Sequence, residues 1–216
     1  MTYTRAIGLG CNKIILLIVR GLALSKIHPN VLTFLGLVIN IGAAALLARG
    51  QFRWAGAVII GAGLFDMVDG RVARETNRVT RFGGFFDSVL DRYSDLALLV
   101  GLLVWYGSIN RPFYVVLTAL VMTGSVMVSY TRARAENSIP TCKVGFMERP
   151  ERVVLLIIGA LFDRMAPVLW VVAILANLTV VHRMIFTWQE AQRLEEAQLR
   201  PAGTQAASQA ASKSSS

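Results

Sequence analysis

Long stretches without any charged side chain constrain this chain more than any other feature of its sequence. Residues 31–48 and 112–130 are charge-free and mostly apolar, and residues 165–181 form a third run of nearly the same length. At about 1.5 Å of rise per residue, a helix of this length covers roughly the hydrocarbon core of a bilayer. The chain is 55% hydrophobic and only 16% charged, which is too apolar for a soluble domain of 216 residues. The sequence therefore predicts an all-α integral membrane protein.

Three shorter apolar runs each adjoin a charged cluster at one end. They cover residues 54–65, 96–106 and 153–162. If each helix extends by a turn or more into its charged cluster, it reaches spanning length with its charges gathered at one depth. Residues 12–24 show an amphipathic pattern that is typical of a helix lying along the membrane interface. We therefore expect six transmembrane helices preceded by an interfacial amphipathic helix.

The composition divides the chain into three parts. Residues 1–28 hold the N-terminus with the interfacial helix, residues 29–190 the six-helix membrane domain, and residues 191–216 a cytoplasmic tail. From about residue 201 the sequence is mostly Ala, Ser, Gln, Gly and Thr. Because such a segment buries too little apolar surface to order itself, we expect it to be disordered.

Basic residues outnumber acidic ones, 22 against 13, and their distribution predicts an orientation. With the N-terminus inside, only four of them fall on the outer side: Arg49, Arg53, Arg111 and Arg164. This bias places both termini, and the charged ends of the helices, on the cytoplasmic side of the inner (plasma) membrane. Such positive charge suits anionic membrane lipids, phosphates or nucleic acid, and the apolar runs disfavour nucleic acid as a partner.

Four aspartates gather at the cytoplasmic ends of the second and third expected helices. Asp66 and Asp69 are three residues apart at the end of one helix, and Asp87 and Asp91 are four apart near the start of the next. Both spacings put two carboxylates on one helical face. The intervening segment is short, so the two pairs can face each other across a helical hairpin.

These carboxylates need a cation, because each acidic side chain within a span costs about 2.5–3.5 kcal/mol on insertion scales. For any single aspartate, pairing with a nearby arginine explains the charge equally well. For all four together, two Mg²⁺ or Mn²⁺ ions that bridge phosphates account better for the cluster, because hard oxygen ligands are what these ions require. A transporter or cation channel is the competing class, but it predicts acids spread through the depth of the bundle.

The aspartates belong to a longer pattern of fixed residues: Asp66, two residues, Asp69-Gly70, two residues, Ala73-Arg74, eight residues, Gly83, three residues, Asp87, three residues, Asp91. This pattern resembles that of the CDP-alcohol phosphotransferases at every fixed position. The resemblance implies a six-helix membrane enzyme that moves a phosphatidyl group from a CDP-linked lipid onto an alcohol and releases CMP. Members of this family are commonly homodimers, which makes a homodimer the expectation here.

The resemblance also implies a role for each matching residue. Asp66, Asp69 and Asp87 would bind the two metal ions, and Asp91 would touch the second metal and act as the general base. A further set would hold the CDP-lipid, partly in the motif and partly in the segment HPNVLT: Asn30, Val31, Leu32, Thr33, Gly70, Ala73, Arg74, Thr80 and Gly83.

Two later stretches bear on the acceptor alcohol. SYTRARAE (residues 129–136) and GFMERPER (residues 145–152) look like the corresponding stretches of the bacterial phosphatidylinositol phosphate synthases, in which basic side chains hold the phosphate of inositol phosphate. Positive-inside anchoring is the alternative explanation of these charges. The candidate ligands of the acceptor phosphate are Arg132, Arg134, Lys143, Arg149 and Arg152.

The phosphatidylglycerophosphate synthases are the main rival within the family. They usually carry Pro after the third aspartate of the pattern and Lys after the fourth, where this chain has Ser88 and Arg92. We therefore expect transfer of the phosphatidyl group of CDP-diacylglycerol to a hydroxyl of inositol phosphate, or of another phosphorylated alcohol, giving phosphatidylinositol phosphate and CMP.

Overall fold

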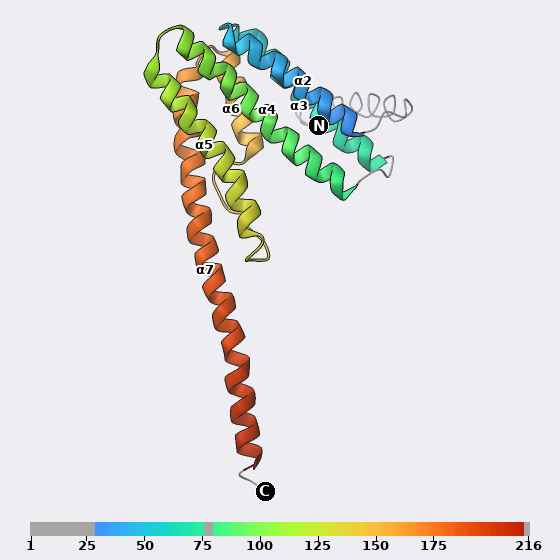
Figure 1. Cartoon of the computed structure of the whole chain (residues 1–216), viewed down its shortest axis with the longest axis vertical. Helices are drawn as coiled ribbons and strands as arrows, with labels where there is room; N and C mark the ends of the chain where they lie inside the picture. Colours follow the sequence, from blue (N-terminus) through green and yellow to red (C-terminus); the bar gives the residue numbers. More distant parts are fainter. Residues whose placement is uncertain (1–28, 76–79, 214–216) are drawn as a thin grey trace, which may run out of the picture.

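The fold is entirely helical over the part of the chain that the computed structural model describes, residues 29–75 and 80–213 (Figure 1). This confirms the predicted all-α class. The interfacial helix expected at residues 12–24 lies outside the described residues. The helices are α2 (Pro29–Ala48), α3 (Phe52–Glu75), α4 (Arg81–Ser108), α5 (Pro112–Ala135), α6 (Arg149–Leu161) and α7 (Met165–Lys213).

Three helices in the described residues are long and apolar enough to cross a membrane. They cover residues 30–48 in α2, 112–135 in α5 and 165–197 in α7, which include the three charge-free stretches of the sequence. α3 and α4 have 24 and 28 residues.

α6 is shorter than the sequence predicts. It has 13 residues, about 20 Å at 1.5 Å per residue, against the roughly 20 residues of a full span. The helix begins at Arg149 because Glu148 and Glu151 form a capping box and Pro150 stands in the first turn. The charged segment before Arg149 therefore does not extend the helix.

The six described helices form a closed ring. Each packs mainly against two others, in the order α2, α3, α6, α7, α5, α4 and back to α2. Leucines of α4, among them Leu98 and Leu102, fill the core with Leu47 of α2. The approach of α2 to α4 depends on Gly101, where an added Cβ would lie 2.3 Å from the carbonyl oxygen of Ala44.

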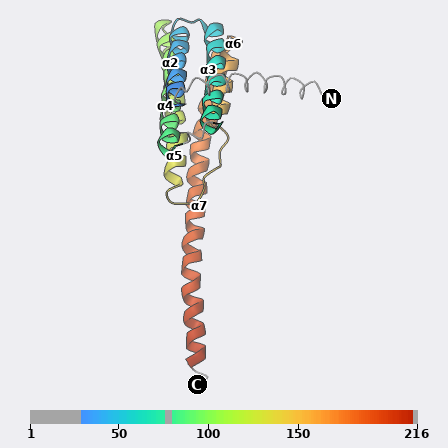
Figure 2. The same cartoon turned by 90° about the vertical axis from the view of Figure 1, so that its right-hand side faces the viewer.

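The connections differ in length at the two ends of the ring. Residues 49–51, 109–111 and 162–164 make short turns at one end, seen at the top of Figures 1 and 2. At the other end, residues 136–148 form a long connection between α5 and α6. Thr179 of α7 holds it by accepting hydrogen bonds from the backbone N–H groups of Phe146 and Met147, each at 3.0 Å.

α7 continues well past the other helices, as both views show. It runs to Lys213 and so includes the segment from about residue 201. Ala and Gln favour helix, and adding residues to an existing helix avoids the cost of nucleation. The disorder expected of this segment from its low apolar content stays a prediction.

Candidate active site

Three carboxylates meet at the end of the ring that faces the long connection. Asp66 near the end of α3 and Asp87 and Asp91 near the start of α4 each offer an oxygen within 4.8 Å of the others. All three side chains are half-buried. Such a set of converging carboxylate oxygens has the donor chemistry that Mg²⁺ or Mn²⁺ requires. The side chain of Asp69, the fourth predicted ligand, lies outside the described residues.

Arg149, the first residue of α6, inserts its guanidinium into this cluster. Its Nη1 lies 3.0 Å from Oδ2 of Asp66 and 2.9 Å from Oδ2 of Asp91. Its Nε donates to Asp95 at 3.4 Å. α6 packs against α3. This contact brings Asp66 of α3 close to Arg149 at the start of α6. The sequence predicted Arg149 as a ligand of the acceptor phosphate, whereas the structure places it among the carboxylates.

Asp95 lies one turn deeper and forms a buried pair with Arg152. Both residues are nearly inaccessible, at 5% and 2% exposure. Nη2 of Arg152 contacts Oδ2 of Asp95, while its Nε and Nη1 have no partner among the described residues. Asp95 therefore neutralises two arginines, and two buried nitrogens of Arg152 are left without a partner in the described part of the chain.

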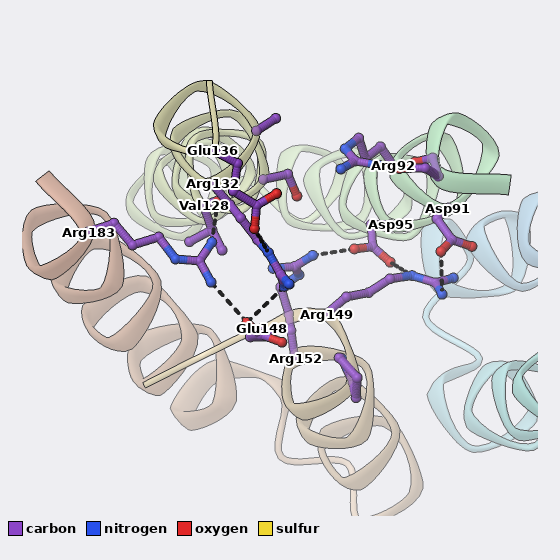
Figure 3. A pocket seen from close by; sticks show the side chains of 14 residues that line it. Asp91, Arg92, Asp95, Val128, Arg132, Glu136, Glu148, Arg149, Arg152 and Arg183 are labelled. Carbon is purple, nitrogen blue, oxygen red and sulfur yellow. Dashed lines mark hydrogen bonds and ion pairs between the residues drawn. The ribbon is translucent and has the colours of Figure 1, made fainter. Parts of the chain in front are cut away.

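A cavity of about 410 Å³ opens beside the carboxylate cluster (Figure 3). Asp91 of the cluster lines this cavity, and so does Arg149, which pairs with the cluster. The carboxylate cluster and the cavity therefore share a wall. Four further arginines line the cavity: Arg92 of α4, Arg132 of α5, Arg152 of α6 and Arg183 of α7. We call this space the arginine cavity.

Glu148 organises two of these arginines. Its Oε1 lies 3.2 Å from Nη1 of Arg132 and 3.0 Å from Nη2 of Arg183. Arg183 is 1% exposed and also donates to the backbone carbonyls of Val144, at 2.8 Å, and Val128. Five arginines and four acids line the cavity, and two nitrogens of Arg152 have no partner among the described residues, so the cavity is suited to an anion.

Comparison with known proteins identifies the chain. Residues 26–191 match the model of the CDP-alcohol phosphatidyltransferase family. The chain belongs to this family. Phosphatidylinositol phosphate synthase of Mycobacterium tuberculosis is 37% identical over 183 residues, covering 79% of this chain and 84% of the relative. Archaetidylinositol phosphate synthase of Methanothermobacter thermautotrophicus is also 37% identical, over 165 residues, covering 73% of this chain and 82% of the relative.

Solved structures show the same fold. The crystal structure of Mycobacterium tuberculosis phosphatidylinositol phosphate synthase with CDP-DAG bound has a TM-score of 0.76 and 33% identity, covering 82% of this chain and 94% of that one. The structure of this enzyme in complex with manganese and citrate has a TM-score of 0.73 and 34% identity, covering 79% and 87%. Like the rest of its family, this CDP-alcohol phosphatidyltransferase depends on divalent metal ions, and its cluster of Asp66, Asp87 and Asp91 has the donor chemistry to hold one.

The predicted nucleotide contacts that the structure describes in full lie at the starts of α2 and α4. Thr80 caps α4 by accepting from the backbone N–H of Gly83 at 2.9 Å, and a Cβ on Gly83 would lie 3.4 Å from Oδ1 of Asn30. Thr33 lines a small cavity together with Asp66 and Asp91. Val31 is 49% exposed and Leu32 is buried in the core. Gly70, Ala73 and Arg74 belong to the last turns of α3, where the structure describes the helix but not the side chains.

Two predicted acceptor ligands lie away from the arginine cavity. Arg134 lines a separate, largely apolar groove between α5 and α7, beside Tyr130 and Trp188. Lys143 is exposed on the long connection and is not part of the cavity wall. Both belong to the stretches that resemble the synthases, but their side chains point elsewhere.

Arg183 is the cavity residue that the sequence analysis missed. Its place after the last apolar stretch indicates by itself only a cytoplasmic charge. One signal was present in the sequence, because Arg183 follows Thr179 by four residues and therefore shares its helical face. That face of α7 contacts the long connection.

Proposed function

We propose that this protein transfers the phosphatidyl group of CDP-diacylglycerol to a hydroxyl of inositol phosphate, forming phosphatidylinositol phosphate and CMP. One observation carries the proposal: the carboxylate cluster and the arginine cavity share Asp91 and Arg149. A metal-assisted centre for the CDP-lipid and a pocket for an acceptor phosphate are thus direct neighbours.

Asp66, Asp69, Asp87 and Asp91 would hold two divalent cations, Mg²⁺ or Mn²⁺, which neutralise pyrophosphate charge when bound. Asp91 takes the proton from the acceptor hydroxyl, because it faces both the cluster and the cavity. The hydroxyl oxygen then forms a bond to the lipid-side phosphorus, the bond from that phosphorus to the CMP oxygen breaks, and CMP leaves with the electron pair.

The arginine cavity would bind the phosphate of the acceptor. A phosphate monoester carries close to two negative charges at neutral pH, and arginine forks form charge-assisted hydrogen bonds to it. Arg132, Arg152 and Arg183 hold their guanidinium groups around the cavity. One kind of relative is named an archaetidylinositol phosphate synthase and the other a phosphatidylinositol phosphate synthase. The inositol phosphate part is common to both names, which supports this acceptor. The lipid part differs between them, and we propose CDP-diacylglycerol as the donor.

The two positions that separate this chain from the phosphatidylglycerophosphate synthases both line the arginine cavity. Ser88 and Arg92 lie on its α4 side, and Nη1 of Arg92 contacts the carbonyl and hydroxyl oxygens of Ser88. A proline in place of Ser88 would lack the hydroxyl, and a lysine in place of Arg92 would lack the planar guanidinium group. Because the difference falls at the cavity wall, it supports an acceptor other than glycerol phosphate.

The proposed setting is the inner (plasma) membrane, with six helices in the bilayer and both termini and the site cytoplasmic. The four outer basic residues all lie in or beside the short turns, and the arginine cavity lies at the opposite end of the ring. This arrangement lets a water-soluble acceptor meet a lipid donor at the interface. We also propose a homodimer, on the strength of the family resemblance.

An acceptor screen tests the proposed function. Purified full-length protein in detergent would receive CDP-diacylglycerol and Mg²⁺ with inositol phosphate, glycerol phosphate, inositol or serine, and CMP release would be measured. We expect release with inositol phosphate well above that with the other three. Preference for glycerol phosphate would favour the rival synthase, and preference for inositol or serine would contradict a phosphate pocket.

A further inference from the structure

Arg149 stands in two sites at once. Its Nη1 bridges Asp66 and Asp91, at 3.0 and 2.9 Å, and the same side chain lines the arginine cavity. We propose that Arg149 is a movable counter-cation. It neutralises these two carboxylates in the metal-free protein and turns into the arginine cavity when a divalent cation binds, where it completes the site for the acceptor phosphate. The inference rests on the proposed function.

Competition for the carboxylates is the first step of the argument. A nitrogen about 3 Å from each of two carboxylate oxygens stands close to the position that a shared cation would take, because Mg²⁺ binds oxygen at about 2.0–2.1 Å. Asp66 and Asp91 are both members of the cluster that could hold a metal. Two like charges at such short range repel each other strongly in a partly buried site. Arg149 and a divalent cation therefore exclude each other at these oxygens.

Arg149 also has room to leave. Its side chain is 31% exposed and borders a cavity of about 410 Å³. Arg152, three residues further along α6, is 3% exposed at its side chain and holds Asp95. When Arg149 moves, Asp95 keeps this partner, and Asp66 and Asp91 gain the metal. No carboxylate among these three is left without a cation.

This exchange couples the two ligands. In the metal-free protein one arginine of the cavity is engaged with carboxylates, and in the metal-loaded protein it is available for the phosphate. Metal and acceptor therefore favour each other's binding, by the same factor in both directions. The acceptor phosphate is bound tightly only after the metal centre is assembled.

Manganese binding by the metal-stripped full-length protein provides the first test. Free Mn²⁺ would be measured by electron paramagnetic resonance for the wild type, Arg149→Gln and Arg149→Lys. A matched control, Arg132→Gln, removes a charge from the same cavity without touching the cluster. We expect Arg149→Gln to bind Mn²⁺ roughly 3- to 10-fold more tightly. Arg149→Lys and the control should stay near the wild type, and an unchanged or weaker affinity of Arg149→Gln would overturn the proposal.

Coupling to the acceptor separates a movable arginine from a fixed one. Inositol phosphate binding would be measured by calorimetry with and without Mn²⁺. In the wild type, Mn²⁺ should raise the affinity by roughly 5-fold or more beyond the rise seen in Arg149→Gln. An equal rise in both proteins would mean that Arg149 stays in place, and the inference would fall while the proposed function stood. Absence of saturable Mn²⁺ binding by the wild type would overturn both.

Discussion

At the scale of single residues, Asp91 connects the chemistry to the acceptor. Its carboxylate belongs to the metal cluster, pairs with Arg149 and lines the arginine cavity. Its side chain is 20% exposed, so it is reachable by a ligand. Of the described cluster members it is the one that lines this cavity, which suits a group that removes a proton from the acceptor.

Neutralising the carboxylates should separate their two roles. We expect Asp91→Asn to lower turnover by about 100-fold or more, through loss of the base, while CDP-diacylglycerol still binds. Asp66→Asn should lose activity together with Mn²⁺ affinity, because a metal ligand is removed. Asp163→Asn makes the same change at the other end of the ring, at a φ of 54° that Asn tolerates, and should retain activity. Turnover like that of the wild type in Asp66→Asn or Asp91→Asn would remove that residue from the site.

Arg132 gives the cleanest test of the acceptor pocket, because its side chain is 36% exposed and not part of the core. A charge-assisted hydrogen bond contributes about 1.5–3 kcal/mol, so Arg132→Gln should raise the KM for inositol phosphate roughly 10- to 100-fold. The KM for CDP-diacylglycerol should change little. Arg134→Gln, two residues away but in a different groove, is the matched control. Equal effects of the two variants, or equal effects on both substrates, would argue against the pocket.

Helical spacing predicted some of these residues and left others out of reach. The pairing of Asp87 with Asp91 follows from four-residue spacing alone, and Asp66 joins them because a short segment links their helices. The position of Arg149 among acids of α3 and α4 depends on which helix packs beside α6. Such neighbours in the ring are not encoded in local periodicity, so the sequence analysis did not predict the ion pairs of Arg149 with Asp66 and Asp91.

At the scale of elements, the long connection between α5 and α6 shapes one side of the cavity. The hydroxyl of Thr179 accepts hydrogen bonds from the backbone N–H groups of Phe146 and Met147. Gly145, which has a φ of 139°, lies against the side chain of Thr179. A Cβ on Gly145 would lie 2.4 Å from Cγ2 of Thr179. Glu148 follows Met147 directly, so this attachment positions Glu148, the ion-pair partner of Arg132 and Arg183.

Replacing Thr179 by Val should loosen this connection. The buried N–H of Met147 would lose its acceptor, at a cost of about 1–3 kcal/mol, and Glu148 would be less firmly placed. We expect a lower unfolding temperature and a higher KM for inositol phosphate. Thr123→Val is the control, because its hydroxyl donates only to the carbonyl of Ala119 in its own helix. A KM effect of the same size in both variants would contradict this role of the connection.

The contact of α2 with α4 should depend on the missing side chain of Gly101. Gly101→Ala would place a Cβ 2.3 Å from the Ala44 carbonyl oxygen, and the forced separation should destabilise the fold by about 1–3 kcal/mol. Gly107→Ala, in the same helix, meets no atom within 4 Å. Thermal unfolding in detergent should therefore show a drop for the first variant and little change for the second. Equal stability of the two would show that the helices separate at no cost.

At the scale of the whole molecule, all six described helices contribute to one end of the ring. α3 and α4 supply the carboxylates, α5, α6 and α7 supply the arginines, and the start of α2 carries Asn30 and Thr33 beside them. The sequence predicted the helices and their order from hydropathy. It did not predict that α6 is short and begins only at Arg149, because that depends on the capping box at Glu148.

The nature of the lipid product tests the central claim most directly. The purified protein would be incubated with CDP-diacylglycerol, inositol phosphate and Mg²⁺, and the lipids analysed by mass spectrometry, with an EDTA-treated sample as the control. We predict a metal-dependent lipid that carries both the phosphatidyl phosphate and the intact phosphate of the acceptor, formed in step with CMP. CMP release without such a lipid, or the same product in the presence of EDTA, would contradict the account.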